Sequence, residues 1–157
     1  GLEKLLPRDA LVQELEGRRR LGQRVAFTNG CFDVLHAGHV QYLRDARAQA
    51  DALVVGLNSD AGVRALKGSG RPVNPVEARA LVLAALEAVD YVTVFGEATP
   101  LALIEAVRPD VLVKGADYRK DEVAGAAFVE SYGGRVHLAP LREGFSTSRA
   151  LHLLGAA

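Results

Sequence analysis

The amino-acid sequence predicts an α/β fold in which a five-stranded parallel sheet is covered by helices on both faces. Short apolar runs recur along the chain, and segments with apolar residues at helical spacing separate them. Strands that are apolar throughout are typical of parallel sheets, because helices cover both faces of such a sheet. The chain has 157 residues, of which 49% are hydrophobic, so we expect one domain over residues 1–157.

The expected strands are the apolar segments 25–27, 52–57, 91–95, 111–113 and 135–139. The first is followed by Thr28, Asn29 and Gly30, which we interpret as a turn. The expected helices are residues 6–20, 39–50, 75–88, 99–107 and 122–132, with a closing helix from residue 147. We interpret the glycine-rich stretch 67–72 as a flexible loop. Sheets of this kind bind ligands beyond the carboxyl ends of their strands, where the strand order reverses.

The charge balance and the cysteine count narrow the possible functions. Lys plus Arg and Asp plus Glu both number 19, so the formal net charge is zero. Such a chain does not bind nucleic acid or an anionic membrane through bulk charge, although a local basic pocket can bind a small anion. No apolar run reaches the roughly 20 residues that span a bilayer. Cys31 is the only cysteine, which excludes an internal disulfide and favours a cytoplasmic protein.

Two histidines lie at a predicted strand–turn–helix junction. His36 and His39 are three residues apart, where the helix over 39–50 is expected to begin. The free N–H groups and the positive end of a helix dipole attract phosphate, and an imidazole N–H can donate to a phosphate oxygen. We therefore predict a phosphate site around this pair. The alternatives are purely structural histidines, or a metal site that also uses Cys31 and Asp33.

Further polar residues are expected at the same edge of the sheet. Lys67 lies in the glycine-flanked loop, where a flexible cation can close over phosphates. Lys114 directly follows the strand over 111–113. Ser146 and Thr147 precede the last expected helix, where hydroxyls cap a helix and can contact an anion. The alternatives are solvent-exposed positions for the lysines and a purely capping role for the hydroxyls.

The segment Gly30-x-Phe32-Asp33-x-x-His36-x-Gly38-His39 resembles the G-x-F-D-x-x-H-x-G-H signature of the cytidylyltransferase-like branch of the HIGH-motif nucleotidyltransferases. The resemblance implies a Rossmann-like, doubly wound α/β domain. In that family a substrate phosphate attacks the α-phosphorus of a nucleoside triphosphate and releases pyrophosphate, with Mg²⁺ bound by the triphosphate. The two histidines would bind the triphosphate and stabilise the transition state, and no residue is assigned as a metal ligand.

Other blocks resemble the heptose 1-phosphate adenylyltransferase group, which occurs both as a free-standing enzyme and as the C-terminal domain of a bifunctional ADP-heptose synthase. The blocks are residues 58–60, 67–68, 71–75 with Arg79, 113–118 and 146–148. The resemblance implies catalytic roles for His36, His39 and Lys67. It implies nucleotide contacts from Asn29, Gly30, Cys31, Phe32, Asp33, Gly38, Lys114, Gly115, Asp117, Ser146 and Thr147. It implies substrate contacts from Arg71, Asn74 and Arg79.

For two of these residues a structural alternative stays open. Asp33 could serve the turn itself, since aspartate side chains often accept hydrogen bonds from nearby backbone. Arg79 lies inside an expected helix, where an ordinary surface or salt-bridging role is the alternative. The chain has no room for a partner sugar-kinase domain, so we expect a free-standing form or an excised domain.

The resulting hypothesis is an adenylyltransferase that joins AMP from ATP to a sugar 1-phosphate, with D-glycero-D-manno-heptose 1-phosphate as the expected acceptor. Within the same class, the alternative is a cytidylyltransferase for glycerol 3-phosphate or a similar alcohol phosphate. The alternative from another class is a non-catalytic nucleotide-binding regulatory module. Loss of a signature histidine or of the loop lysine would favour that function, and neither residue is lost. Relatives of this group are commonly dimers, so we expect a homodimer that binds ATP or CTP and a phosphorylated small molecule, without nucleic acid or a membrane.

Overall fold

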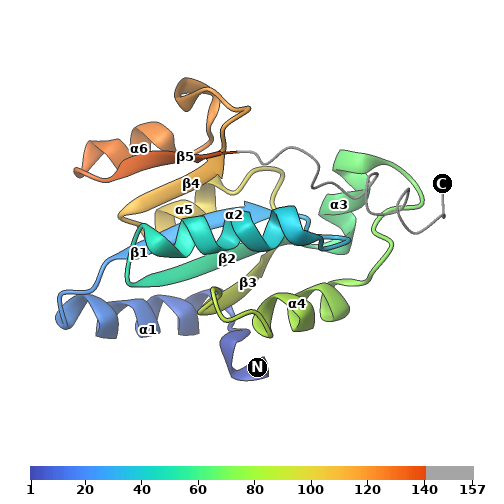
Figure 1. Ribbon diagram of the computed structural model, residues 1–157, viewed down its shortest axis with the longest axis horizontal. Helices are drawn as coiled ribbons and strands as arrows, with labels where there is room; N and C mark the ends of the chain where they lie inside the picture. The colour runs from blue at the N-terminus through green and yellow to red at the C-terminus, as the bar shows by residue number, and fades with distance from the viewer. Residues whose placement is uncertain (141–157) are drawn as a thin grey trace.

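The computed structural model describes residues 1–140, which form a five-stranded sheet with helices on both sides (Figure 1). The strands are β1 (Val25–Gly30), β2 (Ala52–Asn58), β3 (Tyr91–Phe95), β4 (Val111–Gly115) and β5 (Arg135–Ala139). Each hydrogen-bonded pair of strands is parallel, and the order across the sheet is β3-β2-β1-β4-β5. The predicted Rossmann-like, doubly wound α/β fold is confirmed.

The helices lie before and between the strands along the chain, with both α3 and α4 between β2 and β3. They are α1 (Arg8–Arg20), α2 (Ala37–Ala48), α3 (Asp60–Lys67), α4 (Val76–Ala84), α5 (Leu101–Val107) and α6 (Ala126–Ser131), with short 3-10 segments η1 (Leu2–Lys4) and η2 (Lys120–Glu122). Among the described residues, no helix combines the length and the apolar content that crossing a membrane requires.

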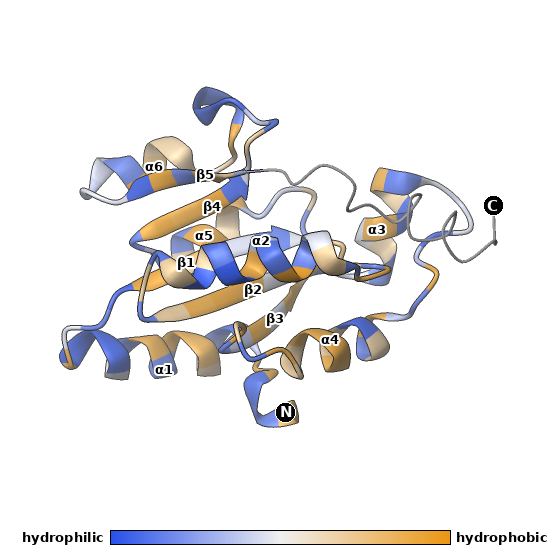
Figure 2. Ribbon diagram, viewed as in Figure 1, coloured by the Kyte–Doolittle hydropathy of each residue, from blue (hydrophilic) through white to orange (hydrophobic). Residues whose placement is uncertain are grey.

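Two hydrophobic clusters lie on opposite faces of the sheet. On one face, α1, α5 and α6 pack their buried side chains against the sheet, with Leu15, Ile104 and Val129 among them. On the other face, α2 and α4 contribute side chains such as Leu43 and Leu83. Strand β2 is buried along its whole length and most residues of β1, β3 and β4 are buried, and Figure 2 colours most of β2, β3 and β4 as hydrophobic. Burial on both faces is the reason for the uninterrupted apolar runs of the sequence.

The strand order reverses between β1 and β4. From β1 the chain proceeds outward through β2 and β3, then returns to place β4 on the other side of β1. Backbone pairing of β1 with β4 ends at Phe27↔Leu112. In contrast, β1 stays paired with β2 as far as Gly30↔Leu57, and β4 with β5 as far as Gly115↔Ala139. Strands β1 and β4 therefore separate at their carboxyl ends, which is where open α/β sheets bind ligands.

Several element boundaries differ from the sequence prediction. Thr28, Asn29 and Gly30 are the last residues of β1 rather than a turn, because pairing with β2 continues through them. Lys114 and Gly115 end β4 rather than following it. Helix α2 begins two residues earlier than expected, at Ala37.

Helix α3 was not predicted at all. It has only eight residues, and Ser59 caps it by accepting a hydrogen bond from the Gly62 N–H. Lys67 is therefore the last residue of a helix, and the glycine-rich loop begins after it at Gly68, whose φ is 93°. The expected closing helix from residue 147 lies outside the described residues.

Candidate active site

His36 and His39 meet at the N-terminus of α2. His36 is the N-cap, and its Nδ1 accepts a hydrogen bond from the Gly38 N–H at 3.0 Å. The His39 Nδ1 accepts from the His36 backbone N–H at 3.3 Å, which completes a reciprocal capping box. The centroids of the two rings are 4.1 Å apart. The motif thus brings both imidazoles to the positive end of one helix, as the sequence predicts.

These hydrogen bonds fix the tautomer of both rings. A nitrogen that accepts a hydrogen bond carries no proton, so each neutral imidazole holds its proton on Nε2. Burial lowers the pKa of His36, and burial together with the positive charges of His36 and Lys67 lowers the pKa of His39 to about 4. At neutral pH the pair is uncharged, with two Nε2–H groups left to donate to an anion.

The turn between β1 and α2 is tightly packed around Phe32. This residue adopts a positive φ of 46°, and its ring lies edge-on to His39 at a centroid distance of 5.7 Å. A Cβ on Gly30 would come within 2.9 Å of the Phe32 ring, so only glycine fits there. The buried Phe32 ring therefore packs against the His39 ring and restricts its orientation.

Asp33 joins this turn to the segment that precedes α4. Its buried carboxylate accepts hydrogen bonds from the backbone N–H groups of Val73 and Asn74 and from the Arg71 Nε at 2.7–2.9 Å. The Asn74 side chain donates in return to the Asp33 carbonyl. Burial alone would raise the pKa of Asp33, but these donors outweigh it and hold the pKa below its usual value. The carboxylate therefore joins two loops, and its partners lie 38–41 residues away, which differs from the local turn role given as its alternative.

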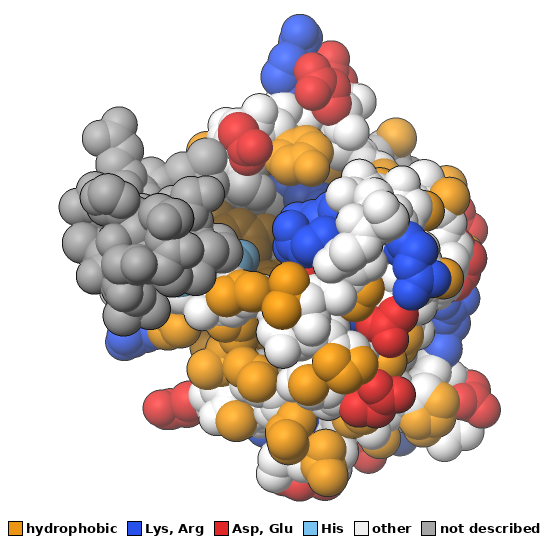
Figure 3. Space-filling model, turned by 90° about the vertical axis from the view of Figure 1, so that its right-hand side faces the viewer, with side chains coloured by type: hydrophobic (Ala, Val, Ile, Leu, Met, Phe, Trp, Pro, Cys, Tyr) orange, Lys and Arg blue, Asp and Glu red, His pale blue; other side chains and the backbone are white. Residues whose placement is uncertain are grey.

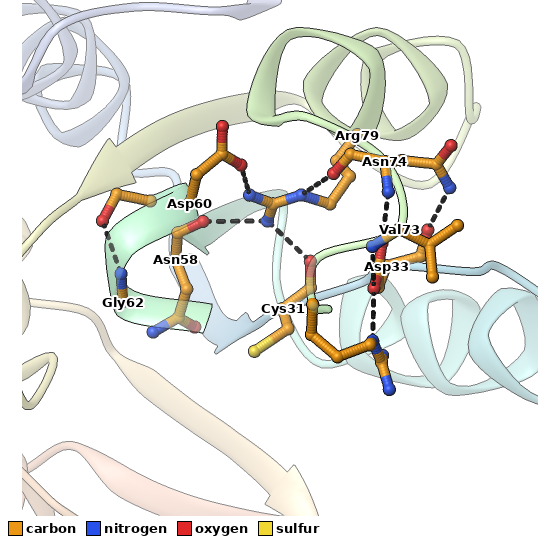
Figure 4. Close-up of polar contacts among 10 residues, drawn as sticks. Cys31, Asp33, Asn58, Asp60, Gly62, Val73, Asn74 and Arg79 are labelled. Carbon is orange, nitrogen blue, oxygen red and sulfur yellow. Dashed lines mark hydrogen bonds and ion pairs between the residues drawn. The ribbon is translucent and has the colours of Figure 1, made fainter. Parts of the chain in front are cut away.

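Arg79 is the largest fully buried side chain among the described residues. Its guanidinium donates to the carbonyl oxygens of Cys31, Asn58 and Asn74, and it forms a 2.7 Å ion pair with Asp60 (Figure 4). No surface of this side chain is exposed. The expectation that Arg79 contacts the substrate is therefore corrected: it holds together the loops around the site.

Lys114 and Asn29 lie at the ends of the two strands that separate. The Lys114 Nζ lies 5.2 Å from the centre of the Tyr118 ring. Burial lowers the pKa of Lys114, and the charges of Asp117 and Cys31 act in the opposite direction. Among the described residues, the Asn29 Oδ1 is a buried oxygen without a hydrogen-bond partner. Buried polar atoms are rarely left unpaired, so this oxygen is available to a ligand donor.

Lys67 lies at the end of α3, where its side chain is exposed. Its charge acts on His39, which places the lysine on the same side of the molecule as the histidine pair. Figure 3 shows a histidine at the floor of a hollow on this face, with Lys or Arg side chains beside it. A cation at the end of a helix followed by two glycines of positive φ, Gly68 and Gly70, is well placed to approach an anion.

Comparison of the sequence with protein-family models identifies a family whose matched region contains this site. The family model described as cytidylyltransferase-like matches residues 27–149, which is more than half of the chain. The chain belongs to the cytidylyltransferase-like family. In this family member, the matched region begins within β1 and includes the histidine pair, the Asp33 loops and the strand end at Lys114.

Curated relatives of this family member are much longer than the chain. A protein named bifunctional protein HldE from Acidiphilium cryptum is 58% identical over 148 residues, which cover 94% of this chain and 30% of that protein. A protein of the same name from Rhodospirillum rubrum is 62% identical over 133 residues, covering 85% of this chain and 27% of that protein. The chain thus spans about 30% of the length of the curated relatives it matches.

Two solved structures share the fold. The lipopolysaccharide core biosynthesis protein from Thermoplasma volcanium aligns with a TM-score of 0.62 and 26% identity, covering 77% of this chain and 98% of that one. A pantoate-beta-alanine ligase from Francisella tularensis aligns with a TM-score of 0.57 and 15% identity over 84% of this chain and 66% of that one. The second likeness is one of fold alone.

The structure brings most of the expected site residues to one edge of the sheet. These residues surround the point where β1 and β4 separate. They lie on the turn after β1, at the ends of β1 and β4, and at the end of α3. Ser146 and Thr147 lie outside the described residues. Within residues 1–140, no group of three or more His, Cys, Asp or Glu side chains could hold a metal ion.

Sequence reasoning missed two residues beneath the site, Thr28 and Tyr42. Their hydroxyls contact one another at 2.7 Å, and both lie within hydrogen-bond distance of the Val113 carbonyl. The sequence offered two signals for this contact, a threonine within an apolar strand and a tyrosine three residues after His39. The contact could not be predicted from them, because the shared Val113 carbonyl comes from a distant part of the chain.

Proposed function

We propose that this chain is an adenylyltransferase that transfers AMP from ATP to a sugar 1-phosphate, giving an ADP-sugar and pyrophosphate. One observation carries the proposal. Two neutral imidazoles present their Nε2–H groups at a helix N-terminus, beside the point where β1 and β4 separate. This arrangement matches the charge that develops on phosphate oxygens during attack at phosphorus.

The proposed reaction needs no covalent enzyme intermediate. An oxygen of the sugar phosphate forms a bond to the α-phosphorus of ATP, and the bond from that phosphorus to the pyrophosphate oxygen breaks. His36 and His39 donate to the phosphates and stabilise the transition state. Lys67 and Lys114 supply positive charge, so the protein contributes positioning and electrostatic stabilisation.

Mg²⁺ would enter as part of the nucleotide substrate. The described residues offer phosphate donors and lysines rather than a cluster of anionic ligands, which fits an ion carried by the triphosphate. Bound there, the ion neutralises charge on the phosphate oxygens.

The remaining nucleotide contacts are proposed from the family resemblance. They comprise Asn29, Gly30, Cys31, Phe32, Asp33, Gly38, Gly115 and Asp117, together with Ser146 and Thr147. Of the proposed substrate contacts, Arg71 keeps a side chain that is 37% exposed while its Nε is bound to Asp33. We retain Arg71 and Asn74 as the acceptor side of the site.

The proposed acceptor is D-glycero-D-manno-heptose 1-phosphate. Support comes from the blocks that resemble the heptose 1-phosphate adenylyltransferase group, from the 58–62% identity to proteins named HldE, and from the likeness to a lipopolysaccharide core biosynthesis protein. The proposal includes a cytoplasmic homodimer that binds no nucleic acid. The half-exposed Leu81 and Val82 on α4 are apolar surface that such a dimer could cover.

A matrix of substrates tests the proposal. Pyrophosphate release is measured with ATP or CTP against heptose 1-phosphate or glycerol 3-phosphate. We expect turnover with ATP and heptose 1-phosphate at least about a hundredfold above the other combinations, because an unpaired polar group in a specific site costs several kcal/mol. Preference for CTP and glycerol 3-phosphate would replace this proposal with the cytidylyltransferase alternative, and binding without turnover would favour a regulatory module.

A further inference from the structure

A buried hydroxyl and a partly buried one form a pair under the site, at the place where β1 and β4 separate. The Thr28 Oγ1 is 2.7 Å from the Tyr42 hydroxyl oxygen. The Val113 carbonyl oxygen is 3.0 Å from the first and 3.2 Å from the second. Thr28 is fully buried, and Tyr42 packs against the hydrophobic cluster of its face. Three segments of the chain, from β1, α2 and β4, therefore meet at this polar triad.

The proton inventory of the triad requires both hydroxyls to stay protonated. Two hydroxyl protons serve three close contacts, so one hydroxyl donates to the carbonyl while the other donates to its neighbouring hydroxyl. Burial raises the pKa of Tyr42 to about 12, although the bond with Thr28 opposes this. Tyr42 therefore acts as a neutral donor and acceptor across the physiological range, and every polar atom of the triad is paired.

The triad continues the contact between β1 and β4 after their backbone pairing has ended. The last paired residues are Phe27 and Leu112, and the next residues on the two strands are Thr28 and Val113. Beyond this point the strands carry Asn29 and Lys114. The side-chain triad thus fixes how far apart these two strand ends lie.

Each member of the triad is also close to a proposed ligand contact. Asn29 follows Thr28, and Lys114 follows Val113. His39 lies three residues before Tyr42 on α2, so the two side chains occupy the same face of that helix. The Tyr42 hydroxyl is therefore a direct link between the helix that carries His39 and the strands that carry Asn29 and Lys114.

We propose that Tyr42 is a positioning residue that sets the placement of His39 relative to Asn29 and Lys114. The inference rests on the proposed function, since it concerns the same site. Tyr42 does not touch the reacting atoms. Its hydroxyl links α2 to β1 and β4 at the point where these strands diverge. This link keeps His39 on α2 at a fixed distance from Asn29 and Lys114 on the strands.

The test uses two tyrosine variants. Y42F removes the Tyr42 hydroxyl from the triad and keeps the phenyl ring. The control is Y132F, because the Tyr132 hydroxyl also donates to a backbone carbonyl, that of Pro109, and burial likewise raises its pKa to about 12. Tyr132 lies just after α6, which packs against the opposite face of the sheet. Each variant removes one partly buried hydroxyl, which has two partners in Tyr42 and one in Tyr132, so losses of stability of the same order are expected from each.

Kinetics separate positioning from stability. We expect Y42F to lower kcat by about tenfold to a hundredfold with little change in the KM for ATP, because a small misplacement of a transition-state donor has this effect. We expect Y132F to leave kcat unchanged. T28V should lower kcat as Y42F does, and the double variant should lose little more, since the two hydroxyls act as one unit. Unchanged kcat in Y42F, or an equal kcat loss in Y132F, would overturn the proposal.

A second readout does not need turnover. The imidazole NMR signals of His39 report its placement directly, and the signals of the same ring in Y132F serve as the reference. We expect Y42F to shift the His39 signals and Y132F to leave them in place. If the wild-type chain turned over none of the substrates, the proposed function would fail by itself. The His39 signals would still decide the placement, with a shift supporting it and unchanged signals contradicting it.

Discussion

At the scale of single residues, His36 and His39 owe their chemistry to backbone hydrogen bonds. Each Nδ1 accepts a backbone N–H, so each ring is held in the tautomer that presents Nε2–H. The same bonds cap α2, which ties the orientation of the donors to the start of the helix. Because the pKa of both imidazoles is lowered, they act as neutral donors and do not need to be protonated to bind phosphate.

The lowered pKa of His39 predicts a pH dependence of stability. The pKa is about 4 in the folded chain against 6.5 for an unperturbed histidine. Above pH 6.5 both states are neutral, and stability is fully present. As the pH falls from 6.5 toward 4, the unfolded state binds a proton that the folded state does not, so stability is lost. We expect a loss of about 1–2 kcal/mol, reduced for solvent screening of this partly exposed ring.

Urea unfolding of the wild-type chain and of H39N between pH 7 and pH 4 measures this loss. Other groups with lowered pKa values, such as Asp33 and His36, titrate in both proteins. The difference between the two curves therefore isolates His39. Parallel curves would show that the His39 ring is as easily protonated in the folded chain as in the unfolded one.

Some residue roles could be predicted from the sequence and others could not. The histidine pair follows from its local motif, because both hydrogen bonds of the capping box lie within three residues. Tyr42 escaped prediction because its partner Val113 is 71 residues away. The internal role of Arg79 escaped for the same reason, since its partners Cys31, Asn58 and Asp60 are 48, 21 and 19 residues away.

At the scale of elements, Arg79 joins α4 to the ends of β1 and β2 and to the start of α3. It donates to three carbonyls and pairs with Asp60 without any exposure of its own side chain. Asp33 makes the second connection, from the turn after β1 to the segment before α4. The loops around the site are therefore held by two buried charged groups.

Replacing Arg79 should weaken the fold strongly. R79M keeps most of the volume but leaves three carbonyls and Asp60 without their donor, so we expect a loss of about 3–5 kcal/mol in the free energy of unfolding. The matched control is R119M, because Arg119 is 74% exposed and pairs with Asp121 and Glu122. Its loss should stay below about 1 kcal/mol. Equal losses in urea unfolding would contradict the role of Arg79.

Element prediction succeeded where periodicity was strong. The strands β2, β3 and β5 were placed within a residue of their observed bounds. For β2, burial along its whole length on both faces leaves a continuous apolar signal. Helix α3 was missed because it is short and runs into a glycine-rich segment that dominates the pattern. The helix expected over 122–132 begins only at Ala126, because Gly125 adopts a positive φ of 86° before it.

At the scale of the whole molecule, the site lies where the strand order of the sheet reverses. The β1–β4 pairing ends early, α2 presents its N-terminus there, and α3 and the loops held by Arg79 and Asp33 surround the same edge. The fold class was predictable because it follows from the alternation of strands and helices. The strand separation was not, because it depends on the register between strands that are distant in sequence.

The central claim is direct transfer of the AMP unit at this edge, and ATP labelled at its α-phosphorus tests it. With heptose 1-phosphate present, the label should appear in the ADP-sugar. H36A and H39A should slow its appearance by about a hundredfold to a thousandfold, whereas H137A, which alters a histidine paired with Asp45, should not. Label retained on the protein, label released as AMP, or undiminished transfer in both H36A and H39A would contradict the account.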